Sequence, residues 1–359
     1  LVLLVISCPC ALVVSIPLGY FGGIGNASRR GILVKGSSFI DALAAVKTVV
    51  FDKTGTLTRG VFQVKDIANV NGFSKNQLLE FAAAAELHSN HPIAVSIMNA
   101  FKRGGRKLDP AMVLDHTDIS GQGVTVRYKG HSIMVGSDTL LHRKSIEHLR
   151  CKFDSTVVHV VVDGGYAGYI TIGDETKPDA RGAVKMLRQQ GVEQVVMLTG
   201  DNACTAEAVA NQLQIDTFHA DLLPEEKVSI LEGLKTGAGK IAFVGDGIND
   251  APVLARADVG VAMGALGSDA AVEVADVVLM DDSPAKMAEA VAIARQTRRI
   301  VWQNIVLAFA VKGTFILFGA VGMATMWEAV FADMGTALVA VANATRVIGV
   351  KGGGGAELS

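Results

Sequence analysis

Apolar residues gather at the two ends of the 359-residue chain, whereas its middle alternates between short apolar runs and polar loops. The nearly uncharged run at 1–25 approaches the ~20 residues that a membrane-spanning helix requires. Runs at 305–325 and 329–350 predict two further spans, joined by a short turn at 326–328. Basic residues flank these runs, so we expect the flanks to lie in the cytosol. The pattern predicts transmembrane helices at both ends of a cytosolic middle.

Short apolar runs in the middle of the chain predict the buried strands of a parallel, doubly wound sheet. They lie at 48–51, 195–198, 241–244, 259–262 and 277–280. Helices fit between them, at 177–190 and 203–213. Repeated strand–loop–helix units of this kind are typical of α/β domains.

A different pattern interrupts this α/β unit. Ser74 is a candidate N-cap for a helix at 75–87, and Pro92 opens a second helix that ends near 101. Alternating segments then predict antiparallel strands, at 125–128, 131–135, 157–162 and 166–172. Helices and strands in separate runs indicate an α+β insertion.

These patterns divide the chain into successive domains. A first spanning helix with a helical connector at 28–45 is followed by an α/β domain in two parts, with the insertion between them. A helical hairpin and a flexible tail complete the chain. The predicted boundaries are 1–46, 47–59, 60–171, 172–298, 299–350 and 351–359.

Composition narrows the possible functions. Half of the residues are hydrophobic, and the mean hydropathy of +0.38 is high for a soluble protein. The net charge of −2 comes from balanced acids and bases, which gives no indication of nucleic-acid binding. Cys151 and Cys204 are isolated, so we expect reduced thiols. No basic segment precedes the apolar run that begins at Leu1, so we expect a portion of a larger protein rather than a cleaved signal peptide.

The polar segment 52–58, Asp-Lys-Thr-Gly-Thr-Leu-Thr, directly follows the first predicted strand. A carboxylate fixed at a strand's carboxyl end can act as a nucleophile. Asp, Thr and Gly are also ordinary turn formers, so the same residues could simply form a loop. As a string, however, the segment resembles the phosphorylation motif of P-type ATPases, in which the aspartate accepts the γ-phosphate of ATP. The resemblance makes Asp52 the nucleophile and Lys53 and Thr54 parts of its site.

Phosphoryl transfer also needs a metal ion and cations that hold the transferred group. Asp246 and Asp250 follow another predicted strand, with Asn249 between them. Their carboxylate oxygens are ligands that suit Mg²⁺. Lys227 could offset this negative charge, although a lysine in a Glu-rich helix is usually a solvated surface charge. The remaining candidates follow the strand at 195–198, and they are Thr199, Gly200 and Asp201.

The order of these segments resembles the haloacid-dehalogenase-like fold of P-type ATPase phosphorylation domains, over residues 47–59 and 172–282. The predicted fold class is therefore an α/β haloacid-dehalogenase-like phosphorylation domain with an α+β nucleotide-binding insertion and transmembrane helices at both ends. In that family the positions matching Asp52, Thr54 and Asp246 hold Mg²⁺, Thr54 through its backbone carbonyl. Asp250 would support this site.

The insertion carries a histidine before a helix and a Gly-Gln-Gly segment. A histidine that precedes a helix usually just faces the solvent. Both nevertheless resemble the nucleotide signatures of heavy-metal-transporting P-type ATPases, in which the positions matching Glu86, His91, Gly121 and Gly123 contact ATP. The family often has Glu where this chain has Asn90.

Cys8-Pro9-Cys10 lies inside the first apolar run. Proline kinks or unwinds a helix, which would expose backbone carbonyls and two thiols at membrane depth. Thiolates suit soft ions such as Cu(I) and Zn(II). A cysteine can also be a small apolar residue in a packed helix, but the doubled motif favours metal passage.

Lys312 and Asp333 lie inside the last two apolar runs, where an ionisable residue costs ~3 kcal/mol on the insertion scale. Snorkelling to an interface is the alternative. A carboxylate beside thiolates suits Zn²⁺ or Cd²⁺ better than Cu⁺, and Lys312 could serve as its counter-ion. Together with Cys-Pro-Cys, this pair resembles the zinc/cadmium/lead-exporting subgroup, so the predicted ligands of the transported ion are Cys8, Cys10 and Asp333.

The sequence therefore predicts ATP-driven export of Zn²⁺, Cd²⁺ or Pb²⁺ from a bacterial-type cell membrane, with Mg²⁺, ATP, the metal ion and lipid as partners. No Thr-Gly-Glu dephosphorylation loop is present in these residues, so we expect an N-terminal half with an actuator domain and earlier helices as a further partner. A Cu⁺ pump is one alternative. A soluble-type aspartate-nucleophile phosphatase with membrane anchors is another, although such enzymes carry Asp where this chain has Thr54. The third alternative is a membrane-anchored nucleotide-binding regulator that does not transport metal ions.

Overall fold

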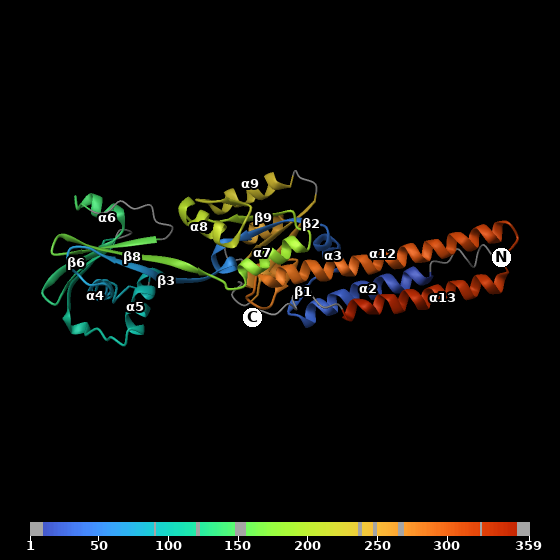
Figure 1. Cartoon of the computed structure of the whole chain (residues 1–359), viewed down its shortest axis with the longest axis horizontal. Helices are drawn as coiled ribbons and strands as arrows, with labels where there is room; N and C mark the ends of the chain where they lie inside the picture. The colour runs from blue at the N-terminus through green and yellow to red at the C-terminus, as the bar shows by residue number, and fades with distance from the viewer. Residues whose placement is uncertain are drawn as a thin grey trace. The chain divides into compact units, whose positions relative to one another are not determined.

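The computed structural model describes residues 10–89, 91–119, 123–147, 156–235, 239–246, 250–264, 269–323 and 325–349. The chain folds into two compact units, both drawn in Figure 1. The first comprises Leu1–Leu57, Lys177–Gly200 and Gln212–Ser359, and the second comprises Thr58–Thr176 and Asp201–Asn211.

The first unit is built on a seven-stranded sheet whose strands are almost all parallel. Its order is β1 (Ile32–Val34), β13 (Val277–Leu279), β12 (Val259–Met263), β11 (Lys240–Gly245), β2 (Val46–Asp52), β9 (Gln194–Leu198) and β10 (Thr217–His219). Only β1 runs antiparallel, against β13. The central strands are buried on both faces, which explains their continuous apolar runs. The predicted parallel sheet is confirmed.

Two groups of helices accompany this sheet. The first group contains α3 (Ser37–Ala44) and α7 (Ala180–Gln189), which both pack against α12 (Ala285–Ala320). The second contains α9 (Pro224–Leu234), α10 (Ala251–Arg256) and α11 (Asp269–Val274). Their apolar side chains enclose Val50, Val196 and Phe243, which are fully buried. The predicted helical connector at 28–45 was wrong in part, because β1 lies within it and pairs with β13.

The second unit is a six-stranded antiparallel sheet with helices packed on it. Its order is β3 (Thr58–Asn69), β8 (Gly165–Thr176), β7 (Thr156–Val162), β6 (His131–Gly136), β5 (Gly123–Tyr128) and β4 (Val113–Ile119). Helices α4 (Lys75–Ala85), α5 (Pro92–Arg103) and α6 (Asp138–Arg143), with the 3₁₀ turn Pro110–Met112, complete it. The Ser74 cap is confirmed, since its hydroxyl accepts from the Gln77 N–H at 3.2 Å.

Sequence patterns missed two strands of this sheet. Strand β4 is mostly exposed and polar, and β3 has only a mixed burial pattern, so neither carries a continuous apolar run. Because β3 and β8 each extend over 12 residues, the sheet begins at Thr58 and ends at Thr176. The unit's edges therefore differ from the predicted 60 and 171 by a few residues.

Three long helices of the first unit lie side by side: α2 (Cys10–Arg29), α12 and α13 (Met326–Thr345) (Figure 1). A 3₁₀ turn, Arg346–Gly349, follows α13. The span predicted at 305–325 is the second half of α12, a single helix of 36 residues that begins at Ala285. The first half of α12 is largely buried, whereas Phe309 and Leu317 in the second half are exposed.

The turn predicted at 326–328 was wrong, because these residues form the first turn of α13. Thr325 caps this helix: its hydroxyl accepts from the Glu328 N–H at 3.4 Å, and the Glu328 carboxylate accepts from the Thr325 N–H at 2.9 Å. This reciprocal capping box defines the start of α13.

Among the residues that the structure describes, two helices are long and apolar enough to cross a membrane by length and composition, at Ala11–Arg29 and Ala285–Ala320. Helix α13 does not meet the same criterion within the described residues. Its polar residues Glu328, Asp333 and Asn343 interrupt the apolar run and lower its mean hydropathy.

Small residues let α2 approach α12 closely. Gly23 of α2 is buried, and a Cβ at this position would overlap the Thr297 side chain of α12. Gly25 lies two residues further along the same helix, and a Cβ there would meet nothing within 4 Å. Close contacts through glycine are a common way for membrane helices to pack.

Replacing Gly23 by Ala should therefore loosen the packing of α2 on α12. We expect Gly23→Ala to lower the melting temperature by roughly 3 °C or more, since overpacking costs about 1–3 kcal/mol. Gly25→Ala is the matched control, and it should leave the melting temperature unchanged or raise it, because Ala favours helix more than Gly. Thermal unfolding of the detergent-solubilised protein measures both. Equal effects of the two substitutions would contradict this packing.

Candidate active site

Asp52 ends β2, the strand between β9 and β11 in the first unit's sheet. In the sheet register Asp52 lies opposite Leu198 of β9, and Phe51 lies opposite Val244 of β11. The residues that follow these two neighbours, Thr199 and Asp246, therefore emerge at the same edge as Asp52. This is the carboxyl edge of a parallel sheet, where ligands bind in α/β folds.

The loop after Asp52 folds tightly against Asp246. Residues Lys53–Leu57 form a kinked turn in which Gly55 has φ +74°. A Cβ on Gly55 would overlap the Asp246 carboxylate, so only glycine fits both the backbone angle and the space. The close approach places the Asp246 carboxylate against the loop of the candidate nucleophile.

Lys227 joins two of the predicted carboxylates. It projects from α9, where Pro224 occupies the first turn. Its Nζ donates to Asp52 Oδ1 at 2.6 Å and to Asp250 Oδ1 at 2.9 Å. Asp52 is 6 % exposed and Asp250 is 2 % exposed, so these ion pairs are desolvated. The interpretation of Lys227 as a solvated surface charge was wrong.

Burial and neighbouring charge determine the protonation of this cluster. Burial and, to a lesser extent, the nearby Asp250 carboxylate raise the pKa of Asp52 to about 7, although Lys227 opposes both effects. Burial alone would lower the pKa of Lys227, but Asp52 and Asp250 outweigh it and raise the pKa. Asp246 also raises the pKa of Asp52. The site therefore has more negative charge than Lys227 alone neutralises.

This donor set fits a magnesium ion. Mg²⁺ prefers oxygen ligands and is typically held by one or two carboxylates, water and substrate phosphate. Asp52 and Asp246 supply carboxylates, and the Thr54 carbonyl belongs to the same loop. Across the described residues, no group of three or more His, Cys, Asp or Glu side chains is arranged around a common metal position. A site with few protein ligands, completed by phosphate and water, agrees with both observations.

The remaining predicted residues of this site differ in exposure. Thr199 is buried, and its backbone is tied to His219 and Leu222 by hydrogen bonds of 3.0 and 3.1 Å. Lys53 is buried, whereas Thr54 and Gly200 are exposed and Asp201 is half-buried. Asn249 lies outside the described residues.

Sequence reasoning missed Lys177. This lysine is 4 % exposed, and its Nζ donates to the Gly55 carbonyl at 2.8 Å and to Asp282 Oδ1 at 2.5 Å. It follows the end of β8 and precedes Pro178, a context in which lysine usually lies on the surface. Its only signal was its place, at the point where the chain returns from the insertion to the α/β sheet.

In the second unit, Glu86 and His91 lie at the ends of neighbouring helices. Glu86 caps the carboxyl end of α4, and His91 caps the start of α5 by accepting from the Ile93 N–H at 3.3 Å. Burial raises the pKa of Glu86, while Ser89 and His91 oppose this shift. The Asp118 carboxylate of β4 is close enough to raise the same pKa further.

Gly123 opens β5 with φ +153°, and a Cβ there would overlap the backbone of β6 at Val135 and Gly136. Only glycine fits this position. Elsewhere in this unit, the rings of His88 and His116 meet edge to face at 5.5 Å between centroids, and His116 lowers the pKa of Glu86. Gly121 lies outside the described residues. The structure thus brings Glu86, His91 and β4 into one region of this unit.

Lys312 and Asp333 form an ion pair between α12 and α13. Lys312 Nζ lies 2.9 Å from Asp333 Oδ1, and both side chains are largely buried. They line a small cavity together with Val311, Phe315, Ala329, Ala332 and Thr336. Cys8 and the side chain of Cys10 lie outside the described part of the chain, as does Cys151, whereas Cys204 is a free, exposed thiol.

Comparisons with known proteins agree with this geometry. The chain is 58 % identical over 349 residues to the zinc-transporting ATPase of Synechocystis, covering 97 % of this chain and 48 % of the relative. It is 56 % identical to the cadmium, zinc and cobalt-transporting ATPase of Bacillus subtilis, covering 98 % of this chain and 50 % of the relative. The chain thus spans about half the length of these curated relatives.

Solved structures give the same result. A zinc-transporting PIB-type ATPase in its E2·Pi state matches with a TM-score of 0.85 at 35 % identity, covering 96 % of this chain and 56 % of that one. The predicted resemblance to zinc- and cadmium-transporting P-type ATPases is confirmed. The family model described as haloacid dehalogenase-like hydrolase matches residues 46–258, more than half of the chain. With this match and its sheet carrying Asp52, the chain belongs to the haloacid dehalogenase-like hydrolase family.

Proposed function

We propose that this chain is the catalytic and C-terminal membrane portion of a P-type ATPase that exports Zn²⁺, Cd²⁺ or Pb²⁺. One observation carries the proposal. The unit that holds the buried Asp52–Lys227–Asp250 cluster also contains α12, and this single helix runs from beside that sheet to the Lys312–Asp333 pair. The names of the relatives, zinc- and cadmium-transporting ATPases, support the same assignment.

The proposed chemistry is phosphoryl transfer to Asp52. A carboxylate oxygen of Asp52 forms a bond to the γ-phosphorus of ATP, the bond from that phosphorus to the β–γ bridging oxygen breaks, and ADP leaves with the electron pair. Lys227 holds the Asp52 carboxylate in place and offsets negative charge at the site. Mg²⁺, held by Asp52, Asp246 and the Thr54 carbonyl, would neutralise phosphate charge. Thr199 and Gly200 lie at the same edge and would donate to the phosphoryl oxygens.

ATP would bind in the second unit near Glu86, His91 and Gly123. His91 lies at the start of α5, where a helix amino terminus favours anionic groups. Gly123 has no side chain, and this would let a nucleotide approach its backbone closely. An imidazole can stack on adenine, which gives His91 a direct role in binding.

The transported ion would lie at Cys8, Cys10 and Asp333, with Lys312 as counter-ion. When no metal is bound, the 2.9 Å contact with Lys312 compensates the Asp333 charge. A metal ion would take over that compensation. A carboxylate among the ligands favours a divalent ion over Cu⁺, and this distinguishes the proposal from a copper pump.

We also propose that the pump is an integral membrane protein whose catalytic domains lie in the cytosol. The other half of the pump would be a further part of the same protein. The relatives are about twice as long as this chain, so the full-length pump would supply the machinery that hydrolyses the aspartyl-phosphate. Thr54 occupies the place where related phosphatases carry a general acid. Its hydroxyl cannot replace a carboxyl as general acid, so the phosphoenzyme should persist until that machinery acts.

Labelling with γ-labelled ATP tests the nucleophile. The full-length protein containing this chain should acquire an acid-stable label in the presence of zinc, and Asp52→Asn should abolish it because the amide is not a nucleophile. Lys227→Met should reduce labelling about 100-fold by leaving two buried carboxylates without their cation. Lys185→Met, on the exposed face of α7, is the control and should label normally. Equal labelling of Asp52→Asn and the unaltered protein would refute the proposal.

The raised pKa of Asp52 predicts a pH effect on stability. In the metal-free protein the pKa of Asp52 rises from 3.8 to about 7 on folding, so burying it charged costs stability as pH rises through this window. Asp52→Asn removes that cost. The substitution should therefore raise the melting temperature by several degrees more at pH 8 than at pH 5. A gain that is the same at both pH values would contradict the assignment.

Replacing Asp333 tests whether this carboxylate is needed for stimulation of labelling by zinc. Asp333→Asn should lower zinc-stimulated labelling about 10-fold or more, because a ligand and the partner of Lys312 are lost together. Glu328→Gln, an exposed acid at the start of the same helix, is the matched control and should stay within about two-fold. Stimulation by Cu⁺ but not Zn²⁺, unaffected by Asp333→Asn, would favour the copper pump instead.

A further inference from the structure

Lys177 connects the loop of Asp52 to the residues just before α12. Its Nζ donates to the Gly55 carbonyl, in the turn that follows Asp52, and to the Asp282 carboxylate. The side chain of Lys177 is 4 % exposed and that of Asp282 is 30 % exposed. A buried ammonium held between two oxygen acceptors keeps this geometry, because removing either partner leaves a desolvated charge.

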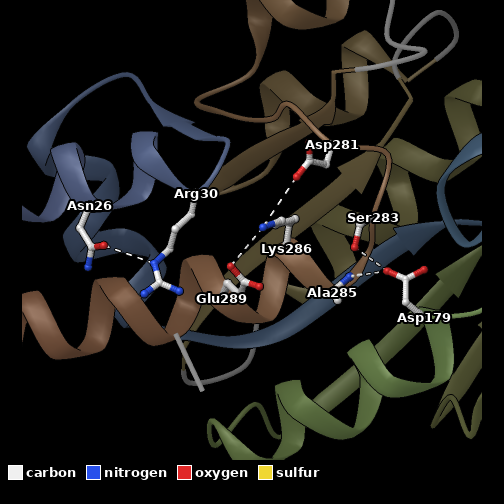
Figure 2. A network of polar contacts seen from close by, with 8 residues as sticks. All are labelled: Asn26, Arg30, Asp179, Asp281, Ser283, Ala285, Lys286 and Glu289. Atoms are coloured by element: carbon white, nitrogen blue, oxygen red, sulfur yellow. Dashed lines mark hydrogen bonds and ion pairs between the residues drawn. The ribbon is translucent and has the colours of Figure 1, made fainter. Parts of the chain in front are cut away.

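Asp179, two residues further along, holds the beginning of α12 itself. Its Oδ2 accepts from the Ser283 hydroxyl at 2.5 Å and from the Ala285 N–H at 3.3 Å, and Ala285 is the first residue of that helix. Figure 2 shows the Asp179 carboxylate pointing at both groups. We call Lys177, Asp179, Asp282 and Ser283 the clasp.

The first turns of α12 are fixed by further contacts. Lys286 Nζ lies 3.7 Å from the Asp281 carboxylate and 3.4 Å from the Glu289 carboxylate (Figure 2). Lys286 therefore connects the segment before α12 to Glu289, within the first turns of the helix. The clasp therefore acts on a stiff helix end. Lys312 lies 27 positions after Ala285 in this helix, which corresponds to roughly 40 Å at 1.5 Å per residue.

We propose that Lys177 is a positioning residue that couples phosphorylation of Asp52 to the metal site, through the clasp and α12. The inference rests on the function proposed above. Gly55 lies three residues after Asp52, in a turn that contacts the Asp246 carboxylate, so adding phosphate at Asp52 changes the forces on this turn. Lys177 then follows the Gly55 carbonyl or releases it. In the first case Lys177 is drawn away from Asp282, and in the second it is left with Asp282 as its acceptor, so either outcome changes the forces on the segment that precedes α12.

A purely structural role for Lys177 predicts something different. If the clasp only stabilised the fold, its loss would lower labelling with and without zinc by the same factor. If it couples the two sites, its loss changes the ratio between these two conditions. The coupling free energy in allosteric proteins typically corresponds to about 5–150-fold.

The test uses the full-length protein, unaltered and with Lys177→Gln, Asp282→Asn or both. Labelling of Asp52 from γ-labelled ATP is measured with and without zinc, together with zinc taken up per ATP hydrolysed in vesicles. We expect each single substitution to lower the ratio of zinc-stimulated to basal labelling by about five-fold or more. The double variant should be no worse than either single one, because both break the same contact.

Two further variants separate coupling from misfolding. Lys177→Arg keeps the charge and should restore most of the ratio, whereas Lys185→Gln removes an exposed lysine from α7 and should leave the ratio unchanged. An unchanged ratio in Lys177→Gln, or a normal ratio in Asp282→Asn, would overturn the inference. Absence of zinc-stimulated labelling in the unaltered protein would instead refute the proposed function, so the two failures are distinguishable.

Discussion

The ion pairs of Lys227 with Asp52 and Asp250 are the interaction on which the candidate active site depends. Buried carboxylates repel one another, and without a cation between them the carboxyl edge of the sheet would not hold both. Helix α9 supplies that cation from a separate segment. The position of α9 against the sheet is therefore tied to the charge state of Asp52, which links the stability of the unit to its chemistry.

The second constraint is the continuity of α12. This helix begins beside the segment that supports the Asp52 loop, packs along α3 and α7, and then carries Lys312 to its contact with Asp333. A continuous helix transmits displacement along its axis more directly than two helices joined by a flexible loop would. The close contact of α2 with α12 at Gly23 brings the helix that begins at Cys10 into the same assembly.

Much of this fold could be predicted from sequence because its strands are buried on both faces and read as continuous apolar runs. Strands β3, β4 and β1 were missed, since their side chains alternate, are polar, or depend on a distant partner strand. Asp52 and Asp246 could be predicted to lie close together because each follows a strand of the same parallel sheet. Lys227 could be added to them only through the resemblance to P-type ATPases. Lys177 could not be found in this way, because its role arises only from the fold that places Gly55 and Asp282 around it.

ATP-dependent metal uptake by inverted membrane vesicles containing the full-length protein tests the central claim most directly. The account predicts zinc accumulation inside the vesicles that requires ATP and is absent in Asp52→Asn. Accumulation of Cu⁺ without zinc, or zinc accumulation that persists in Asp52→Asn, would contradict it.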